Sequence, residues 1–316
     1  MKINVNKKSE KLLGLAAVLM LAAMVLFTGC PNAAGGNSGG SITPPASVDK
    51  TYTIEGIGFT MKGIAAVTNG TLGHADYSSN NDMHMVSLTA YRIGETEVTQ
   101  ELWEKVMGNN PSNFKGAKNP VEQVNWYHAI AFCNKLSIAC HLDPCYTVKD
   151  VDFNSLTFDE IPTKDNGKDT TEWKKVKVEM SKKGFRLPTE AEWEWAAKGG
   201  KEYKWAGTDE LDKLKDYAWY NDNSNSKTHE VKQKQRNGYG LYDMSGNVWE
   251  WCWDQYGTLP NPMPPDYAGP ATSGDDRVSR GGSWYFGAEY CVVGLRFSIS
   301  PDVCNGALGL RLVSRP

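Results

Sequence analysis

The stretch that decides the fold is Gly184-Phe185-Arg186-Leu187-Pro188-Thr189-Glu190-Ala191-Glu192-Trp193-Glu194. Pro188 or Thr189 begins a helix here, and the acidic residues of its first turn suit the positive end of the helix dipole. The nearby Arg186 and the three glutamates predict ion pairs, which must be satisfied once they are partly buried. The stretch therefore indicates scaffold rather than chemistry.

Further helices are predicted before this stretch. An amphipathic helix covers Gln100–Met107 with Thr99 as a credible N-cap, and a second helix follows the run Val124–Trp126. After Gly199 the chain loses regular periodicity and is rich in Gly, Asn and Trp. Strand patterns occur over Tyr52–Met61, Val86–Ile93, Cys145–Val148 and Lys177–Glu179, with a turn-rich stretch around Asn69–Asp82.

The composition is that of a globular protein. Of its 316 residues, 40% are apolar and 22% are charged, and the net charge of −3 without a basic cluster argues against a nucleic-acid partner. The counts of 11 Trp and 31 Gly favour aromatic packing among loops and turns over a helical bundle. Because no linker or repeat interrupts the pattern, one domain is predicted over residues 52–316.

The N-terminus has the pattern of an export signal. Four lysines precede the uncharged apolar run Leu12–Phe27, which is short for a membrane span of about 20 residues, so residues 1–29 are predicted to be a signal peptide. The small residues before Cys30 resemble the bacterial lipobox, in which Cys30 becomes the lipidated first residue of the mature chain. A plain secretory peptide cleaved nearby is the alternative.

The predicted anchor sets the expected location of the protein. Residues 30–51 are expected to form a lipidated N-terminus and a flexible tether, because their Gly, Ser, Ala and Pro cannot build a core. The protein is then expected at the bacterial cell surface as an outer membrane lipoprotein, with the membrane as a partner through its lipid.

The remaining six cysteines leave two possibilities open. Their spacing matches no paired zinc pattern. Export permits disulfides, and Cys140 and Cys145 are close enough in the chain to staple a loop. Buried free thiols fit the pattern equally well.

Five stretches occur in an order that resembles the formylglycine-generating-enzyme (sulfatase-modifying-factor) family. The resemblance covers nearly everything from Tyr52 onward and implies an α+β fold of the C-type-lectin kind. Such a fold has little regular structure, two main helices and small antiparallel sheets. The stretches are Ile93–Thr99, Asn119–Trp126, Gly184–Glu194, Asn237–Trp251 and Arg280–Trp284.

The family resemblance also implies a structural calcium site, although no cofactor is required for the predicted function. Asp243 and Glu250, with the carbonyls of Gly246 and Val248, would match the calcium ligands, and hard oxygen ligands from a short loop suit this ion. A turn held by ordinary hydrogen bonds is the alternative. In either case the alternation predicts Trp249 on the opposite side from Val248 and Glu250.

The enzymes of the family use two cysteines, spaced five apart after the Arg-Gly-Gly-Ser stretch, to bind copper and activate oxygen. Soft thiolates suit Cu(I). By this resemblance the second position is Cys291, but the first is Phe286, which cannot bind copper. Cys304 lies too far along the chain to substitute. A non-catalytic protein is therefore predicted, and a copper-dependent formylglycine-generating oxidase acting on sulfatase cysteines is the alternative.

The C-terminus resembles the variable region of a diversity-generating retroelement, most closely the variable protein of a treponeme. Fixed positions such as Trp284, Ala288, Cys291, Arg296 and Arg311 are expected to hold the backbone of region 280–316, with Trp284 buried. The interspersed positions mix rigid aromatic and small adaptable residues, much as antibody loops do. Ten positions are predicted to share one solvent-accessible face that binds an unknown protein or cell-surface ligand: Tyr285, Phe286, Gly287, Glu289, Tyr290, Leu295, Phe297, Ser298, Ile299 and Ser300. The alternative is that these residues form an ordinary core strand.

Overall fold

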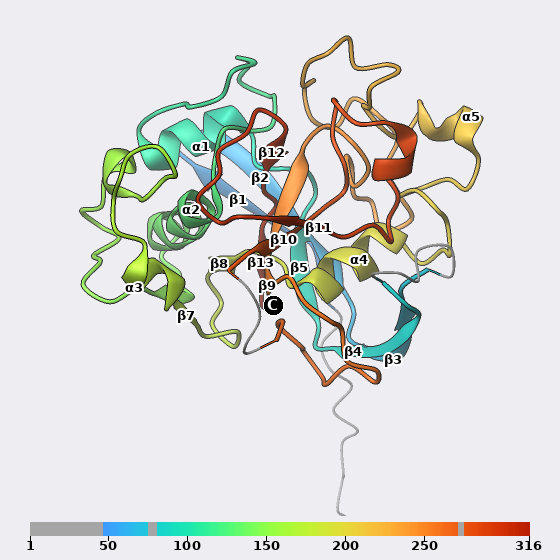
Figure 1. Cartoon of the computed structure of the whole chain (residues 1–316), viewed down its shortest axis with the longest axis horizontal. Helices are drawn as coiled ribbons and strands as arrows, with labels where there is room; N and C mark the ends of the chain where they lie inside the picture. The colour runs from blue at the N-terminus through green and yellow to red at the C-terminus, as the bar shows by residue number, and fades with distance from the viewer. Residues whose placement is uncertain (1–46, 75–80, 271–274) are drawn as a thin grey trace, which may run out of the picture. The chain divides into compact units, whose positions relative to one another are not determined.

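The computed structural model describes residues 47–74, 81–270 and 275–316 (Figure 1). The predicted signal peptide, the lipidation site Cys30 and most of the predicted tether lie outside these residues. The described residues all belong to one compact unit. Among the described residues there is no helix long and apolar enough to cross a membrane.

The domain begins earlier than the predicted residue 52. Strand β1 covers Lys50–Ile54, and before it Ser47 Oγ donates a hydrogen bond to Tyr91 O at 2.8 Å. Arg92 Nε likewise donates to Val48 O at 2.8 Å. The last residues assigned to the tether therefore belong to the domain, because their backbone is held by its sheet.

A five-stranded antiparallel sheet, in the order β1-β2-β5-β13-β8, joins distant parts of the chain. Strands β1 and β2 (Ile57–Ile64) form a hairpin that includes the stretch Tyr52–Met61, over which a strand pattern was predicted. The C-terminal strand β13 (Val313–Ser314) pairs with β5 (Tyr91–Gly94) on one side and with β8 (Phe185–Arg186) on the other. The end of the chain is therefore an inner strand of this sheet.

Helices α1 (Gln100–Met107) and α2 (Trp126–Ala139) pack beside this sheet (Figure 1). Thr99 caps α1 by accepting a hydrogen bond from Leu102 N, which confirms the predicted boundary. Trp103 of α1 stacks on Phe132 of α2 with ring centroids 4.8 Å apart. Both rings lie in the core, so aromatic packing joins the two helices as the composition indicates.

A second sheet has four strands in the order β11-β10-β9-β12. Strand β9 (Trp249–Gln255) is central, pairing antiparallel with β10 (Arg277–Arg280) and parallel with β12 (Leu308–Gly309). The edge strand β11 (Phe297–Ile299) pairs antiparallel with β10. Trp249, Trp251 and Trp253 enter one core cluster and Cys252 enters another, because alternate residues of a strand point to opposite faces.

The rest of the domain consists of short elements and loops. Val86–Ile93 was predicted as one strand but includes parts of two. Strand β4 (His84–Leu88) pairs with β3 (Val67–Leu72), whereas β5 belongs to the five-stranded sheet. The turn-rich stretch also begins later than predicted, because β3 includes Asn69. The remaining elements are β3 (Val67–Leu72), β4 (His84–Leu88), β6 (Tyr146–Thr147), η2 (Phe158–Glu160), α3 (Thr171–Lys174), β7 (Lys177–Val178), α5 (Leu211–Leu214) and η3 (Ala288–Tyr290).

Helix α4 (Glu190–Lys198) begins at a capping box. Thr189 Oγ1 accepts a hydrogen bond from Glu192 N, and the Glu192 carboxylate accepts one from Thr189 N at 2.9 Å. The same carboxylate accepts a hydrogen bond of 2.6 Å from each of the two terminal nitrogens of Arg186. Both side chains are fully buried. The predicted ion pair is thus part of the helix start.

The other two glutamates of α4 pair with arginines that are distant in the chain. Arg296 binds Glu190 through two hydrogen bonds of 2.6 and 2.9 Å. Arg280, from β10, pairs with Glu194 and lies 3.5 Å from Glu190. Because all these side chains are buried, α4 is held to the rest of the domain by matched charges.

Replacement of Arg186 by Met should be strongly destabilising. It leaves the Glu192 carboxylate buried without its cation, which costs about 3–5 kcal/mol. We expect this loss in the free energy of unfolding measured with urea, and most of it should be recovered when Glu192→Leu is added. Lys175→Met removes the partly exposed pair with Glu172 and should cost less than about 1 kcal/mol. A similar cost for Arg186→Met and Lys175→Met would contradict the assignment of Arg186 and Glu192 as a buried ion pair on which folding depends.

Candidate functional site

The ten predicted ligand-binding residues lie at the surface, and none of them is buried. Three of them are large hydrophobic residues with high exposure: Tyr285 is 60% exposed, Phe297 39% and Tyr290 37%. Glu289 is also exposed, and the other six are half-buried. The core-strand alternative therefore does not describe this segment.

Four aromatic side chains of this set gather over Trp249 of β9. The Phe297 ring stacks on the indole of Trp249 with centroids 5.3 Å apart, and Phe286 meets it edge-on at 5.8 Å. Tyr285 and Tyr290 flank Phe286 at 5.5 and 5.0 Å. Trp249 itself is buried. The result is an exposed aromatic patch on a fixed tryptophan.

The side chains of strand β11 point alternately to its two faces. Phe297 and Ile299 lie opposite Ser279 and Arg277 of β10, while Ser298 lies opposite Val278. Ser298 Oγ is 3.1 Å from a carboxylate oxygen of Asp276. Because neighbouring strand residues point to opposite faces, Ser298 does not share the face of Phe297. The prediction that all ten residues lie on one face is therefore too simple.

The backbone beneath the patch is held by scaffold residues. Ser224 Oγ donates to Trp284 O at 2.7 Å, and Asn221 N donates to Phe286 O at 3.0 Å. Neither residue was predicted, because loop groups that hydrogen-bond to a distant backbone leave no periodic signal. Trp284 is half-buried instead of buried, and its ring packs edge-on against the half-buried Phe114 with centroids 5.1 Å apart.

Arg296 and Arg311, which were expected to hold the backbone of region 280–316, are buried, and each pairs with a glutamate. Arg296 binds Glu190, and Arg311 is fully buried against Glu250. Cys291 is buried as well, whereas Ala288 is only half-buried. Arg296, Arg311 and Cys291 are therefore buried, whereas the ten predicted ligand-binding positions are all exposed or half-buried.

The cysteines provide no pair of thiolates. All six that the structure describes are free. Burial raises the pKa of the Cys291 thiol to about 12 and that of Cys304 to about 11, so both stay protonated near neutral pH. Phe286, which the sequence resemblance predicts at the position of the first copper ligand, packs among aromatic rings.

The four residues of the calcium site implied by the resemblance do not fit an ion in this arrangement. Both carboxylate oxygens of Glu250 accept hydrogen bonds from Arg311, and one also accepts from Trp193 Nε1 at 2.7 Å. One Asp243 oxygen accepts from Lys232 N at 2.8 Å. Within the described parts of the chain no group of three His, Cys, Asp or Glu residues is placed to hold a metal. An ion would have to displace Arg311 from Glu250.

Glu97 is a buried carboxylate that the sequence analysis missed. It is 2% exposed and accepts hydrogen bonds from Asn247 Nδ2 at 2.7 Å and Val248 N at 3.1 Å. Burial, followed by the charges of Asp243 and Glu250, raises its pKa well above the ordinary value. Burial also raises the pKa of Asp243 to about 6. The only sequence feature that pointed to Glu97 was its position in the stretch Ile93–Thr99.

A model of the sulfatase-modifying factor enzyme 1-like domain matches residues 43–316. The chaperone protein LppX of Paenibacillus barcinonensis is 38% identical over 257 residues, which cover 76% of this chain and 84% of that protein. The formylglycine-generating enzyme of Streptomyces coelicolor is 40% identical over 147 residues, covering 40% of this chain and 46% of the enzyme. The chain thus matches less than half the length of that enzyme.

The solved structure of Treponema denticola variable protein 1 is similar over most of the domain. It is 59% identical, with a TM-score of 0.81 over 85% of this chain and 99% of that one. These similarities confirm the predicted family, the α+β fold with small antiparallel sheets, and the resemblance to a treponeme variable protein.

Asp243→Asn should reduce the pH dependence of stability. The folded-state pKa of about 6 exceeds the ordinary value of 3.8, so folding favours the protonated acid. Stability from this group is present below pH 3.8 and is lost as pH rises through 6. The full loss should be on the order of 3 kcal/mol, of which about 2 kcal/mol falls above pH 4.5. Urea unfolding from pH 4.5 to 8 should therefore show a decline in stability that is smaller by about 2 kcal/mol in the variant.

The exposed Asp150→Asn is the matched control and should leave the pH profile unchanged. We expect the same profiles with and without a calcium chelator, because Glu250 is already paired with Arg311. A chelator that lowers the stability of the unmodified protein but not that of Asp243→Asn would show instead that calcium binds at Asp243.

Proposed function

The chain belongs to the sulfatase-modifying factor family, and we propose that it is a non-catalytic ligand-binding protein displayed on the bacterial surface. Its ligand, an unidentified protein or cell-surface molecule, binds the ten exposed or half-buried positions between Tyr285 and Ser300. These positions lie in a region, 280–316, that a retroelement diversifies. Diversification would leave a near-copy of the last codons, with adenines at the varying positions, beside a reverse transcriptase gene.

The observation that carries this proposal is the separation of surface from framework. None of the ten side chains is buried, whereas Arg280, Arg296 and Arg311 are buried and each is paired with a glutamate. A site that must accept many side chains cannot depend on them for folding. The aromatic patch over Trp249 supplies rigid contact area at low entropic cost, which suits recognition of a macromolecule.

The chemistry of the region supports a non-catalytic role. A Cu(I) site of two thiolates needs a cysteine at both positions, and Phe286 supplies no thiolate. The remaining Cys291 is buried, and its pKa of about 12 keeps it a thiol. The similarity to Treponema denticola variable protein 1, which spans 99% of that chain, favours the binding role over the oxidase alternative.

A display library that randomises the ten positions should yield binders to an arbitrary protein such as lysozyme. We expect dissociation constants below about 1 µM, in the range of natural antibody interfaces. The control library randomises ten exposed residues between Lys149 and Lys183 and should yield no such binders. Substitutions at the ten positions should change the free energy of unfolding by about 0.5 kcal/mol or less each, whereas Trp251→Ala in the core should cost about 3–5 kcal/mol.

Two outcomes would contradict the binding role. Equal yields from the two libraries would mean that the patch has no special capacity for recognition. Stoichiometric Cu(I) binding together with turnover of a cysteine-containing sulfatase peptide would establish the oxidase alternative.

The proposed anchor is tested separately at Cys30. Its acyl chains should carry the protein into the detergent phase of a phase-partitioning assay. Cys30→Ser should then move the protein to the aqueous phase or stall its processing, while Cys304→Ser should leave partitioning unchanged. Partitioning of Cys30→Ser into detergent as before would refute the anchor.

A further inference from the structure

The ten proposed ligand-binding residues are too few to form a complete interface with a protein. A stable protein–protein interface buries about 800 Å² on each partner and takes about 20–30 residues from each side. The ten residues supply at most half of that number. A protein ligand that binds them therefore also contacts residues outside the ten, and the surroundings of the aromatic patch indicate which residues these are.

Aromatic ring contacts continue from the patch to two residues outside the ten. The ring of Trp284 meets Tyr285 edge-on with centroids 5.4 Å apart, and it meets Phe114 edge-on at 5.1 Å. Tyr285 in turn contacts Phe286, so the series of ring contacts runs without a break from the patch to Phe114. Trp284 and Phe114 are both half-buried, which leaves part of each side chain open to solvent. Because aromatic residues are enriched in protein interfaces, these two rings extend the surface that suits a protein ligand.

Both rings belong to segments that the scaffold holds in place. The backbone N–H of Phe114 donates to Glu122 Oε1 at 2.8 Å, and its carbonyl accepts a hydrogen bond from Gln100 Nε2 at 2.8 Å. Glu122 and Gln100 are fully buried. Trp284 Nε1 donates to Gly306 O at 2.9 Å, which fixes the orientation of the indole. Side chains that are already ordered lose little entropy on binding, so these two rings suit a contact that is the same for every ligand.

A hollow of about 460 Å³ adjoins Phe114, which is part of its lining. His229 and the exposed Lys227 also line it. A ring nitrogen of His229 lies 2.7 Å from Ser224 O, and Ser224 Oγ donates to Trp284 O, so this wall of the hollow is connected to Trp284. The side chains that dominate the energy of protein interfaces pack into pockets of the partner. The hollow is therefore suited to receive one projecting side chain of the ligand.

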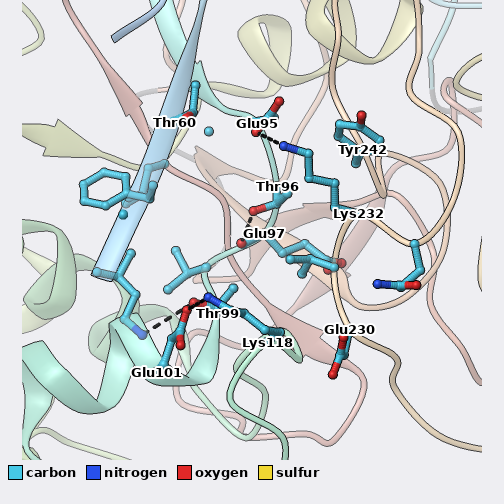
Figure 2. Close-up of a pocket in the computed structure, with 18 residues that line it drawn as sticks. Thr60, Glu95, Thr96, Glu97, Thr99, Glu101, Lys118, Glu230, Lys232 and Tyr242 are labelled. Carbon is cyan, nitrogen blue, oxygen red and sulfur yellow. Dashed lines mark hydrogen bonds and ion pairs between the residues drawn. The ribbon is translucent and has the colours of Figure 1, made fainter. Parts of the chain in front are cut away.

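The hollow beside Phe114 shares Glu230 with a larger hollow of about 590 Å³ (Figure 2). In the larger hollow Lys232 pairs with Glu95 at 2.6 Å, and Lys118 pairs with Glu101. Figure 2 shows both pairs. Because these lysines are already matched by carboxylates of the scaffold, the larger hollow offers a ligand no free cation, and we take Glu230 as the limit of the binding face.

We propose that the ligand is a folded protein that binds the ten residues together with a constant part of the same face, formed by Trp284, Phe114 and the hollow beside Phe114. This constant part rests on the proposed function and specifies its partner. The ten residues decide which protein binds, whereas the constant part contributes the same contacts to each. A small molecule is the less suitable ligand, because a small-molecule site encloses most of its ligand, whereas Tyr285, Tyr290 and Phe297 are exposed.

Binders of lysozyme selected from the ten-position library, as full-length protein, provide the test. Phe114→Ala, introduced into several independent binders, should weaken the affinity of each about five- to thirtyfold, as expected for an aromatic residue that contributes to an interface. The matched control is Phe59→Ala on β2, which removes another half-buried ring with two aromatic neighbours and should leave the affinity unchanged. An unchanged affinity in Phe114→Ala, or equal losses in both variants, would overturn the constant part.

A crosslink separates direct contact from a purely structural role of Phe114. With Lys227→p-benzoylphenylalanine at the hollow, irradiation should join the protein to bound lysozyme. The same group in Lys50→p-benzoylphenylalanine, on the edge strand β1, should give no crosslink. Weaker binding in Phe114→Ala without a crosslink from position 227 would mean that Phe114 only positions Trp284, and it would overturn the proposed contact.

Selection of the same library against fluorescein tests the class of ligand. It should give no binder with a Kd below about 1 µM, a free energy of about −8 kcal/mol. Fluorescein binders as tight as the lysozyme binders would overturn the assignment to a protein ligand. A library that yields no binders at all would refute the proposed function and the constant part with it, whereas lysozyme binders that tolerate Phe114→Ala would refute the constant part alone.

Discussion

The structure depends on the rule that a charge removed from water must meet an opposite charge. Helix α4 carries three glutamates into the interior, and the arginines that match them come from β8, β10 and the segment before β11. The Arg186–Glu192 pair is local to the helix start, whereas the pairs of Glu190 and Glu194 join parts of the chain that are far apart in sequence. A domain with so many loops has few long helices or strands to define its packing. The buried ion pairs add a constraint, because an alternative arrangement would leave a charge buried without its partner.

Buried ion pairs also fix the segment that carries the exposed aromatic patch. Arg280, Arg296 and Arg311 lie in the segment that includes the exposed aromatic patch, yet their guanidinium groups are buried against Glu194, Glu190 and Glu250. The chain therefore reaches the surface between fixed inner contacts. Trp249 supports the aromatic patch from beneath. It belongs to strand β9, so its position does not depend on the exposed residues that pack on it.

Local rules account for the elements that the sequence predicted well. Thr99 and Thr189 cap their helices as expected, because a cap needs only the residues next to it. The family motifs then led to the fold, and the stretch Gly184–Glu194 to the ion pair of Arg186. Features set by distant contacts were missed: Trp284 is half-buried beside Phe114, and Glu250 is occupied because Arg311 returns to it from the other end of the domain. Glu97 lay inside a recognised motif, but its burial follows from the fold alone.

The position of β13 inside the five-stranded sheet has a consequence for quality control. Residues 313–314 pair with β5 and β8 on both sides, so the sheet is incomplete until the last residues of the chain have been made. A stop codon or frameshift between residues 285 and 300 would also remove Arg311, leaving Glu250 buried without its cation. Truncated or frameshifted copies of the chain would thus fail to fold, and proteolysis would remove them before they could accumulate beside intact protein.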